Sequence, residues 1–191
     1  MSTTQNLVES IKQVFPSIKE AQIVADLNTA QLKFASETGL LETRGQLSSI
    51  STNVAWILPS DFDRQTDVVL CDSDGKPKYL GDYNYASQIE FGKFYIYSLN
   101  STPLTAGLNA AIDSAYVHYK KTPVALTSRS IALEIDTQFR DAIESDVLSK
   151  YFSKYPTAMQ ARGETIIARD LSSASWHERK YEKLLLLSAV R

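Results

Sequence analysis

The chain contains two histidines, and histidine is the side chain that most often acts as a general base beside a nucleophile. His118 alternates with Val117 and Tyr119 in a run of strand-forming residues, whereas His177 follows Trp176 in a charged, helix-forming stretch. Neither histidine stands in a nucleophile elbow, an H-E-x-x-H pair or another motif that organises a base. Both histidines are therefore expected to have structural roles.

Metal-binding and phosphate-binding motifs are incomplete. The single Cys71 and two distant histidines do not make a zinc site without carboxylates. The segment DSDG (residues 72–75) alternates carboxylates as a calcium loop does, but the glycine comes too early and no glutamate holds the twelfth position. The segment GLLETRG (residues 39–45) lacks the lysine of a phosphate-binding loop. We expect neither a cofactor nor a metal.

One pair of carboxylates has a spacing that invites a catalytic interpretation. Asp61 and Asp63 could supply the acid and the base of a glycosidase. They follow Pro59 closely, however, and aspartates in that setting more often form turns. The sequence thus predicts that the protein is not an enzyme and has no catalytic residues.

Aromatic residues form the strongest local signal. Seven of them crowd into nineteen positions: Tyr79, Tyr83, Tyr85, Phe91, Phe94, Tyr95 and Tyr97. On an exposed sheet face such rings stack on sugars or on bases. Tyrosine also suits half-buried strands, so packing within the domain explains the same cluster. The sequence leaves both interpretations open.

The composition is that of a soluble globular protein. The chain has 191 residues, of which 43% are hydrophobic and 22% charged, enough for one ordinary domain or two very small ones. No apolar run approaches the roughly 18 residues that span a bilayer. The start, MSTTQNLVESIKQ, does not resemble a secretory signal, and one cysteine fits a reducing compartment.

Charge is distributed unevenly along the chain. Residues 1–147 carry 12 Lys and Arg against 18 Asp and Glu, whereas residues 148–191 carry 8 against 4. A basic end sometimes binds nucleic acid, but here acidic residues alternate with the basic ones. A helix that docks on an acidic protein surface explains this end better.

Hydrophobic spacing divides the chain into helical ends and a strand-rich middle. Residues 1–43 are predicted to be helical, with a capping box at Ser17–Glu20 and a stop at Gly39. Residues 44–135 alternate at strand period, and the segment 72–78 has the composition of a tight hairpin turn. We expect an inserted antiparallel β block there.

Helical spacing resumes over residues 136–175. Asp136 is expected to cap the first helix of this part, and the serines of residues 172–175 to interrupt a later one. Residues 176–191 form a C-terminal tail. The predicted fold is α+β: a single domain, residues 1–191, in which the two ends build a helical bundle around the β block.

Three segments, taken in order, carry a family resemblance. They are TNVAWILPSDFDRQTDVVLCDSDGKPKYL, GKFYIYSLNSTPLTAGLNAAIDSAYVHYKKTP and LEIDTQFRDAIESDVLSKYFSKYP, and an early helical pair precedes them. This order resembles the head-to-tail connector, or adaptor, proteins of tailed bacteriophages, including the tail-tubular-A type of short-tailed phages and the ring proteins of crAss-like phages. The likeness covers about residues 5–156 and rests on pattern, not on an invariant motif.

The resemblance implies a structural protein without catalytic residues. Such a subunit forms a ring, often a dodecamer, docks on the portal protein, extends the DNA channel and offers a platform to the next tail or ring protein. Genomic DNA passes through without sequence-specific binding, and no membrane is involved. The implied location is the virion, with assembly in the host cytoplasm.

Two sets of residues become candidate contacts under this resemblance. The subunit-interface candidates are aromatic: Tyr83, Tyr85, Tyr95 and Tyr97. The candidates for docking on the portal or on a neighbouring copy lie in the C-terminal tail: Trp176, Arg179, Lys180, Lys183, Leu184, Leu185, Leu186 and Leu187. Four consecutive leucines cannot all face one side of a helix. The alternative is that the tail packs on the first helices.

A function of another class also remains open. A carbohydrate-binding or surface-binding β module would use the tyrosine-rich strands as its platform. It would be a monomer with its aromatic rings on an exposed face.

Overall fold

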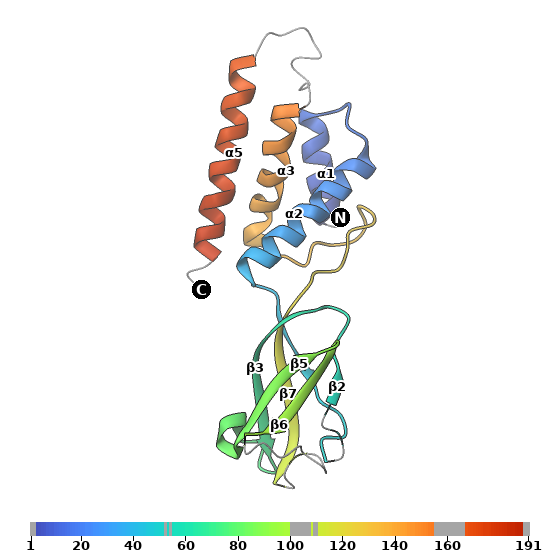
Figure 1. Ribbon diagram of the computed structural model, residues 1–191. Coiled ribbons are helices and arrows are strands. Elements are labelled where there is room, and N and C mark those ends of the chain that lie inside the picture. The colour runs from blue at the N-terminus through green and yellow to red at the C-terminus, as the bar shows by residue number, and fades with distance from the viewer. Residues whose placement is uncertain are drawn as a thin grey trace. The chain divides into compact units, whose positions relative to one another are not determined.

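Helices and strands occupy separate parts of the chain, as Figure 1 shows. The computed structural model describes residues 3–51, 53, 55–99, 108, 111–154 and 167–188. A helical unit comprises the residues up to Leu41 and those from Thr122 onward, and a strand unit comprises Glu42–Lys121. The α+β class predicted from the sequence is confirmed, with helices toward both ends and antiparallel sheets between them.

The described part of the helical unit contains four α-helices and one short 3₁₀ turn. They are α1 (Thr3–Val14), α2 (Glu20–Thr38), η2 (Thr137–Phe139), α3 (Arg140–Lys154) and α5 (Ile167–Ser188). Helices α2 and α3 each contact the other three helices, and the most extensive helix–helix contact joins α3 to α5. None of the described helices is both long and apolar enough to pass through a bilayer.

The core of the helical unit follows the apolar spacing of the sequence. Ile11 of α1 and Phe15, which follows that helix, are fully buried, as are Leu27 and Phe34 of α2 and Ile143 of α3. Burying side chains of this size stabilises the unit by about 1.5–3 kcal/mol each. This apolar packing brings α1, α2 and α3 together around one cluster.

Two of the four helix-boundary signals in the sequence agree with the structure. Gly39 adopts φ 59° after α2 and donates its N–H to the Ala35 carbonyl at 2.8 Å. Asp136 accepts a hydrogen bond from the Gln138 N–H at 3.3 Å and so caps the start of η2. The serines of residues 172–175, in contrast, lie inside the continuous helix α5.

The capping box at Ser17–Glu20 was wrong. Helix α2 begins at Glu20, after Lys19 in an extended conformation, without a side-chain cap. Ile18 is buried in the helical core, and its N–H donates to the Phe15 carbonyl at 3.2 Å. The chain therefore makes a turn between α1 and α2 here, because the burial of Ile18 in the core overrides the local capping preference.

The strand unit consists of two antiparallel sheets. The larger has the order β1–β7–β3–β4, with β1 (Glu42–Gln46), β7 (Ile112–Lys121), β3 (Phe62–Asp72) and β4 (Pro77–Tyr79). The smaller has the order β2–β6–β5, with β2 (Ala55–Ile57), β6 (Lys93–Ser98) and β5 (Tyr85–Glu90). A 3₁₀ turn, η1 (Leu80–Tyr83), connects β4 to β5.

Alternation along each strand separates a core face from an outer face. In β7, Ala115, Val117 and Tyr119 are buried, whereas the intervening residues are only half-buried. In β6, Phe94 and Ile96 are buried in the same cluster. The strand unit therefore has its own hydrophobic core.

The hairpin turn predicted at residues 72–78 is present. The Asp72 carboxylate accepts hydrogen bonds from the N–H groups of Asp74 at 3.0 Å and Lys76 at 2.9 Å. Gly75 adopts φ 72°, a conformation that suits glycine. The alternating carboxylates of this segment thus serve the turn.

The boundaries of the β block differ from the predicted ones. The strand unit spans residues 42–121, whereas residues 122–135, expected in the block, belong to the helical unit. Leu126 and Leu133 are buried in the helical core, and Gln31 of α2 binds this segment. Its side chain donates to the Val124 carbonyl at 3.0 Å and accepts from the Glu134 N–H at 3.2 Å. An irregular segment, held to the helical core by a few buried side chains, was read as strand.

The chain was also expected to be one domain with a separate tail. It forms two compact units instead, and residues 176–188 of the expected tail continue helix α5. Residues 189–191 lie outside the described residues.

Candidate functional site

His118 lies on the outer face of the larger sheet, together with Tyr116 as the sequence indicated. It pairs in register with Arg44 on one side and Asp67 on the other. The Arg44 guanidinium lies over the Tyr116 ring at 5.2 Å. These residues form a mixed-charge surface in which His118 lies between a guanidinium and a carboxylate on the neighbouring strands. A structural role for His118 accounts for this setting.

His177 is packed in the helical unit. Its ring stacks on Phe152 at 5.5 Å between centroids, and Trp176 meets it edge-on at 4.8 Å. Burial, followed by the positive charge of Lys180, holds the pKa of His177 below its ordinary value. Its Nδ1 lies 3.5 Å from the Ser145 hydroxyl, but Ser145 is 1% exposed, which closes that hydroxyl to a substrate.

The two aspartates considered for acid–base chemistry have different surroundings. Asp61 accepts a hydrogen bond from the Tyr119 hydroxyl at 3.1 Å, and Asp63 is exposed. A cavity of about 370 Å³ opens nearby, between Gly45, Trp56 and Pro59. Its described lining includes no acidic, basic, histidine or cysteine side chain. Among the described residues, no three or more histidine, cysteine, aspartate or glutamate side chains come together in a group that could hold a metal ion.

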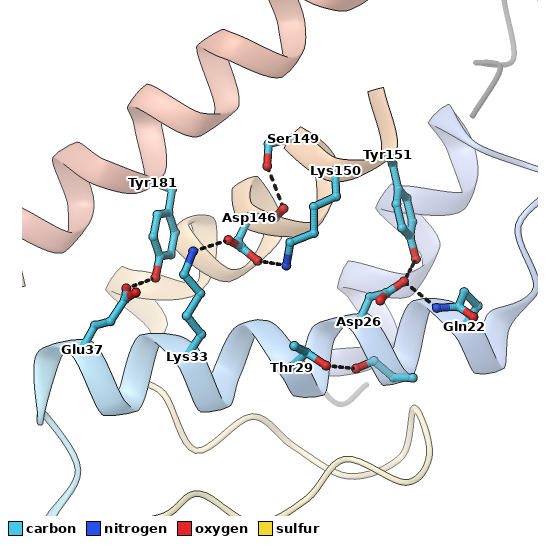
Figure 2. A network of polar contacts seen from close by, with 11 residues as sticks. Gln22, Asp26, Thr29, Lys33, Glu37, Asp146, Ser149, Lys150, Tyr151 and Tyr181 are labelled. Atoms are coloured by element: carbon cyan, nitrogen blue, oxygen red, sulfur yellow. Dashed lines mark hydrogen bonds and ion pairs between the residues drawn. The ribbon is translucent and has the colours of Figure 1, made fainter. Parts of the chain in front are cut away.

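A network of polar contacts joins α2, α3 and α5 (Figure 2). Asp146 of α3 lies between Lys33, which is 2.9 Å away on α2, and Lys150 of its own helix. Lys33 also lies over the ring of Tyr181 from α5, at 4.3 Å. The Tyr181 hydroxyl donates a hydrogen bond to Glu37 of α2. The network therefore fixes which face of α5 turns inward.

Asp146 is the most buried charge of this network, with 6% of its side chain exposed. Burial alone would raise the pKa of Asp146, but the hydrogen bonds and charges of Lys150 and Lys33 outweigh it and hold that pKa below its ordinary value. Burial and the Glu37 carboxylate raise the pKa of Tyr181, so its hydroxyl keeps the proton that it donates. Both groups are held in the protonation state that the network needs.

Helix α5 has an inner and an outer face. Tyr181 and Ser188 are buried, and Leu184 and Leu185 pack on the helical core. The opposite side carries residues at helical spacing that we call the α5 outer face: Trp176, Arg179, Lys183, Leu186 and Leu187. Its apolar members are 57%, 70% and 54% exposed for Trp176, Leu186 and Leu187.

The structure thus separates the eight docking candidates. Five of them form the α5 outer face, while Leu184 and Leu185 belong to the core. Lys180 lies on the flank, where it forms an ion pair with Asp141 at 2.9 Å and approaches the Trp176 ring at 5.5 Å. Helix α5 therefore contains residues that pack internally as well as exposed residues that are available for docking.

The four tyrosine candidates also separate. Tyr95 and Tyr97 alternate with the buried Phe94 and Ile96, so they lie on the outer face of the smaller sheet. Tyr85 is partly buried and packs against the strand core. The side chain of Tyr83 lies outside the described residues.

Sequence reasoning missed an exposed apolar tip on the hairpin that joins β5 to β6. Phe91 is 95% exposed and adopts φ 49°, and Gly92 follows with φ 73°. Ile57, which pairs in register with Lys93, is 84% exposed. The Leu58 N–H donates to the Gly92 carbonyl at 3.2 Å, which fixes this edge beside the turn. We call Phe91 and Ile57 the hairpin tip.

The backbone at Phe91 is unfavourable. The two positive φ angles define a turn that prefers Asn-Gly or Gly-Gly, because the left-handed conformation costs a residue with a large side chain about 1–2 kcal/mol. A solvent-exposed phenyl group offers no burial within the chain to offset this cost. The sequence signal was present as Phe-Gly between two strands, at a position where asparagine is the usual residue.

Comparisons with known proteins do not assign the chain to a family. No protein-family model matches it, and no curated protein sequence is significantly similar to it.

The Asp146 network yields a prediction for the Asp146→Asn variant. In the unmodified protein, the charged Asp146 contributes fully to stability above the pKa of an unfolded aspartate, about 3.9. This contribution is lost as the pH falls through the lower pKa of Asp146 in the folded state. At pH 7 the variant should unfold more easily by roughly 1–3 kcal/mol, because two lysines lose a charged acceptor. Urea unfolding followed by circular dichroism at 222 nm measures this loss, which should shrink near pH 3.

Asp141→Asn is the matched control for this variant. Its ion pair with Lys180 is of the same type, but the Asp141 side chain is 64% exposed. Exposed pairs contribute about 0–1 kcal/mol, so the control should change little. Equal losses in the two variants would contradict the importance assigned to Asp146.

The hairpin tip yields a second stability prediction. Phe91→Asn should stabilise the strand unit by about 1 kcal/mol, because asparagine adopts the left-handed conformation more readily. Phe91→Ala keeps the strain and should have a much smaller effect. In a Trp176→Phe background the fluorescence of buried Trp56 reports unfolding of the strand unit alone. Loss of stability in Phe91→Asn would contradict the strain assigned to this turn.

Proposed function

We propose that this protein is a structural subunit of a bacteriophage head-to-tail connector ring. In this role it docks on the portal protein, extends the DNA channel and offers a platform for the next tail or ring protein. Neighbouring copies complete the ring, which we expect to be a dodecamer in the virion, assembled in the host cytoplasm. The proposal rests on the family resemblance of the sequence together with the surface of α5.

The α5 outer face is the observation that carries the proposal furthest. Soluble monomers rarely expose several large apolar side chains together, and such surfaces mark contacts with other macromolecules. Trp176, Leu186 and Leu187 are each more than half exposed on one side of a helix whose other side is held in the core. Tryptophan and arginine are enriched among the residues that dominate binding energy.

The chemistry of this face indicates what a partner must offer. Apolar residues lie toward both ends of the face; Arg179 and Lys183 lie between them, and the exposed Glu182 borders the face. A complementary surface has apolar pockets with acidic groups between them. In a connector, that surface belongs to the portal or to a neighbouring copy.

A structural role also agrees with how the polar residues are used. His177, Ser145 and Asp61 all serve internal packing or hydrogen bonds. The formal net charge of −2 gives the protein little general attraction for DNA phosphates. DNA that passes through a ring of such subunits would meet few counter-charges that retain it.

A second candidate function has its own observation. Tyr95 and Tyr97 share the outer face of the smaller sheet, and Gln88 lies opposite Tyr95 on that face. Two tyrosine rings beside an amide make a platform on which sugar rings can stack. A carbohydrate-binding or surface-binding module would use this platform as a monomer.

Native mass spectrometry of the protein mixed with the portal protein of the same phage tests the proposal. We expect a complex with several copies of the chain on one portal ring. The double variant Arg179→Glu and Lys183→Glu should weaken this complex at least about tenfold, a loss of about 1.4 kcal/mol or more, because it reverses the charge of the α5 outer face. The double variant Lys19→Glu and Lys76→Glu changes the net charge equally at exposed sites elsewhere and should bind normally.

Two outcomes would overturn the proposal. One is a chain that stays monomeric and never associates with the portal. The other is micromolar binding to glycans that Tyr95→Ala and Tyr97→Ala abolish, which would establish the second candidate instead. Deletion of residues 176–191 is a poorer test, because it also removes Tyr181, which is buried against Phe34.

A further inference from the structure

The cavity beside Gly45 in the strand unit has the size and lining of a ligand site. Its volume of about 370 Å³ lies within the range of ligand pockets, roughly 300–1,000 Å³. Apolar side chains line much of it, among them Leu47, Trp56 and Val117. The Trp56 indole N–H already donates to the Ser48 carbonyl at 2.6 Å, so the ring offers the cavity an apolar surface.

One wall of this cavity is β1, the edge strand of the larger sheet. Only one side of β1 has a neighbour among the described strands, and there the Leu47 N–H donates to the Ala115 carbonyl at 2.8 Å. Backbone hydrogen bonds alternate along an antiparallel strand. Gly45 therefore also faces β7, whereas Arg44 and Gln46 direct their N–H and C=O groups outward. Both residues are exposed, so this edge can hydrogen-bond a further strand.

Gly45 determines which side chain an added strand must bring. A Cβ at Gly45 would lie 3.7 Å from the side chains of Val117 and Tyr119 and 3.9 Å from Pro59, so this position faces the buried side of the sheet. Residues opposite each other on neighbouring strands place their side chains on the same face. The residue opposite Gly45 would thus direct its side chain into the cavity, and an edge glycine is best covered by a large apolar neighbour.

We propose that this cavity binds an extended peptide segment of another protein. The segment adds to the outer edge of β1, antiparallel like the described strand pairs of this sheet, and its backbone bonds Arg44 and Gln46. Its residue opposite Gly45 places a large, uncharged apolar side chain in the cavity, against the Trp56 ring. This binding activity goes beyond the proposed connector role and does not depend on it.

The cavity also discriminates among possible occupants. The sequence of β1 is ETRGQ, without a large apolar side chain, so two β1 edges paired with each other would leave the cavity unfilled. The described lining includes no charged side chain, and burial of an unpaired charge is strongly unfavourable. A partner segment with an uncharged apolar residue meets both conditions. It also covers Ile57, which belongs to the lining and is 84% exposed.

Selection from a library of displayed random heptapeptides tests the proposal. The Trp176→Phe protein serves as the target, because Trp56 is then its only tryptophan and reports on the cavity. Each enriched peptide is synthesised and titrated into this protein. We expect peptides that change Trp56 fluorescence saturably and that share one large, uncharged apolar residue.

Two changes in such a peptide separate the role of its side chain from that of its backbone. Alanine in place of the shared apolar residue should weaken binding by about tenfold or more, because the cavity is then unfilled. N-methylation of the two residues beside it should have an effect of about the same size, because their N–H groups face β1. N-methylation of the apolar residue itself, whose N–H faces away from β1, is the matched control and should weaken binding much less.

Variants of Gly45 test the site from the protein side. The φ angle of Gly45 is not positive and a Cβ there makes ordinary contacts, so Gly45→Ala should not lower thermal stability. It should weaken peptide binding, and the larger Gly45→Val should weaken it by about tenfold or more, because its side chain occupies the cavity. Gly81→Val is the matched control, since a Cβ at Gly81 meets no atom within 4 Å and Gly81 lies outside the lining.

Four results would overturn the proposal. The first is that no enriched peptide changes Trp56 fluorescence saturably, and the second is that peptides bind Gly45→Ala and Gly45→Val as tightly as the parent protein. The third is binding that N-methylation beside the apolar residue leaves unchanged, which would identify a site for small apolar molecules. The fourth is self-association in sedimentation velocity that Gly45→Val abolishes, which would identify a second copy of the chain as the occupant.

Discussion

The helical unit depends on one buried carboxylate. Asp146 lies within the packed helices with only 6% of its side chain exposed, and it remains charged because Lys33 and Lys150 both reach it. A charge in that position must be paired, since an unpaired one destabilises a protein interior strongly. The pairing ties α3 to α2, while Lys33 and Glu37 of α2 also hold Tyr181 of α5. Together with the packing of Tyr181 on Phe34, this pairing sets the rotation of α5, and so the side chains that it presents to solvent.

The orientation of α5 explains how a single run of leucines serves two purposes. Leu184 and Leu185 complete the helical core, and the next two leucines lie on the solvent side. A helix rotated by about 100° per residue cannot place four consecutive residues on one face. Two of the four consecutive leucines are therefore core residues, and the other two are exposed.

The sequence predicted the features that depend on local periodicity and turn chemistry. The α+β class, the stop at Gly39, the cap at Asp136 and the hairpin turn at Asp72 all follow from short patterns, and the structure contains them. The predicted end of the β block at residue 135 was wrong because residues 122–135 are held to the helical unit by hydrogen bonds with Gln31 and Asn28 of α2, which is far away in sequence. Such tertiary burial leaves no period in a single sequence.

The candidate surfaces were predictable in part. Helical spacing suffices to select Trp176, Arg179 and Lys183 for one face, but only the contacts of Tyr181 show that this face is the outer one. The high density of tyrosines in the sequence singled out this region. Alternation along β6 places Tyr95 and Tyr97 on its outer face, but only the structure shows that Tyr85 packs against the strand core. The hairpin tip was missed because phenylalanine between two strands normally indicates a buried position.

The pairing of β1 with β7 has a consequence for how this chain can change. The strand unit begins at Glu42 and ends at Lys121, and Glu42 lies opposite Lys120 in the register. Adjacent strands are about 5 Å apart, so the chain enters and leaves this unit at nearly the same point. The two points at which the helical unit connects to the strand unit are therefore close together, as they would be if a short loop joined them. Lengthening, shortening or replacing the strands alters one surface of the protein while the connectivity and core of the helices stay the same.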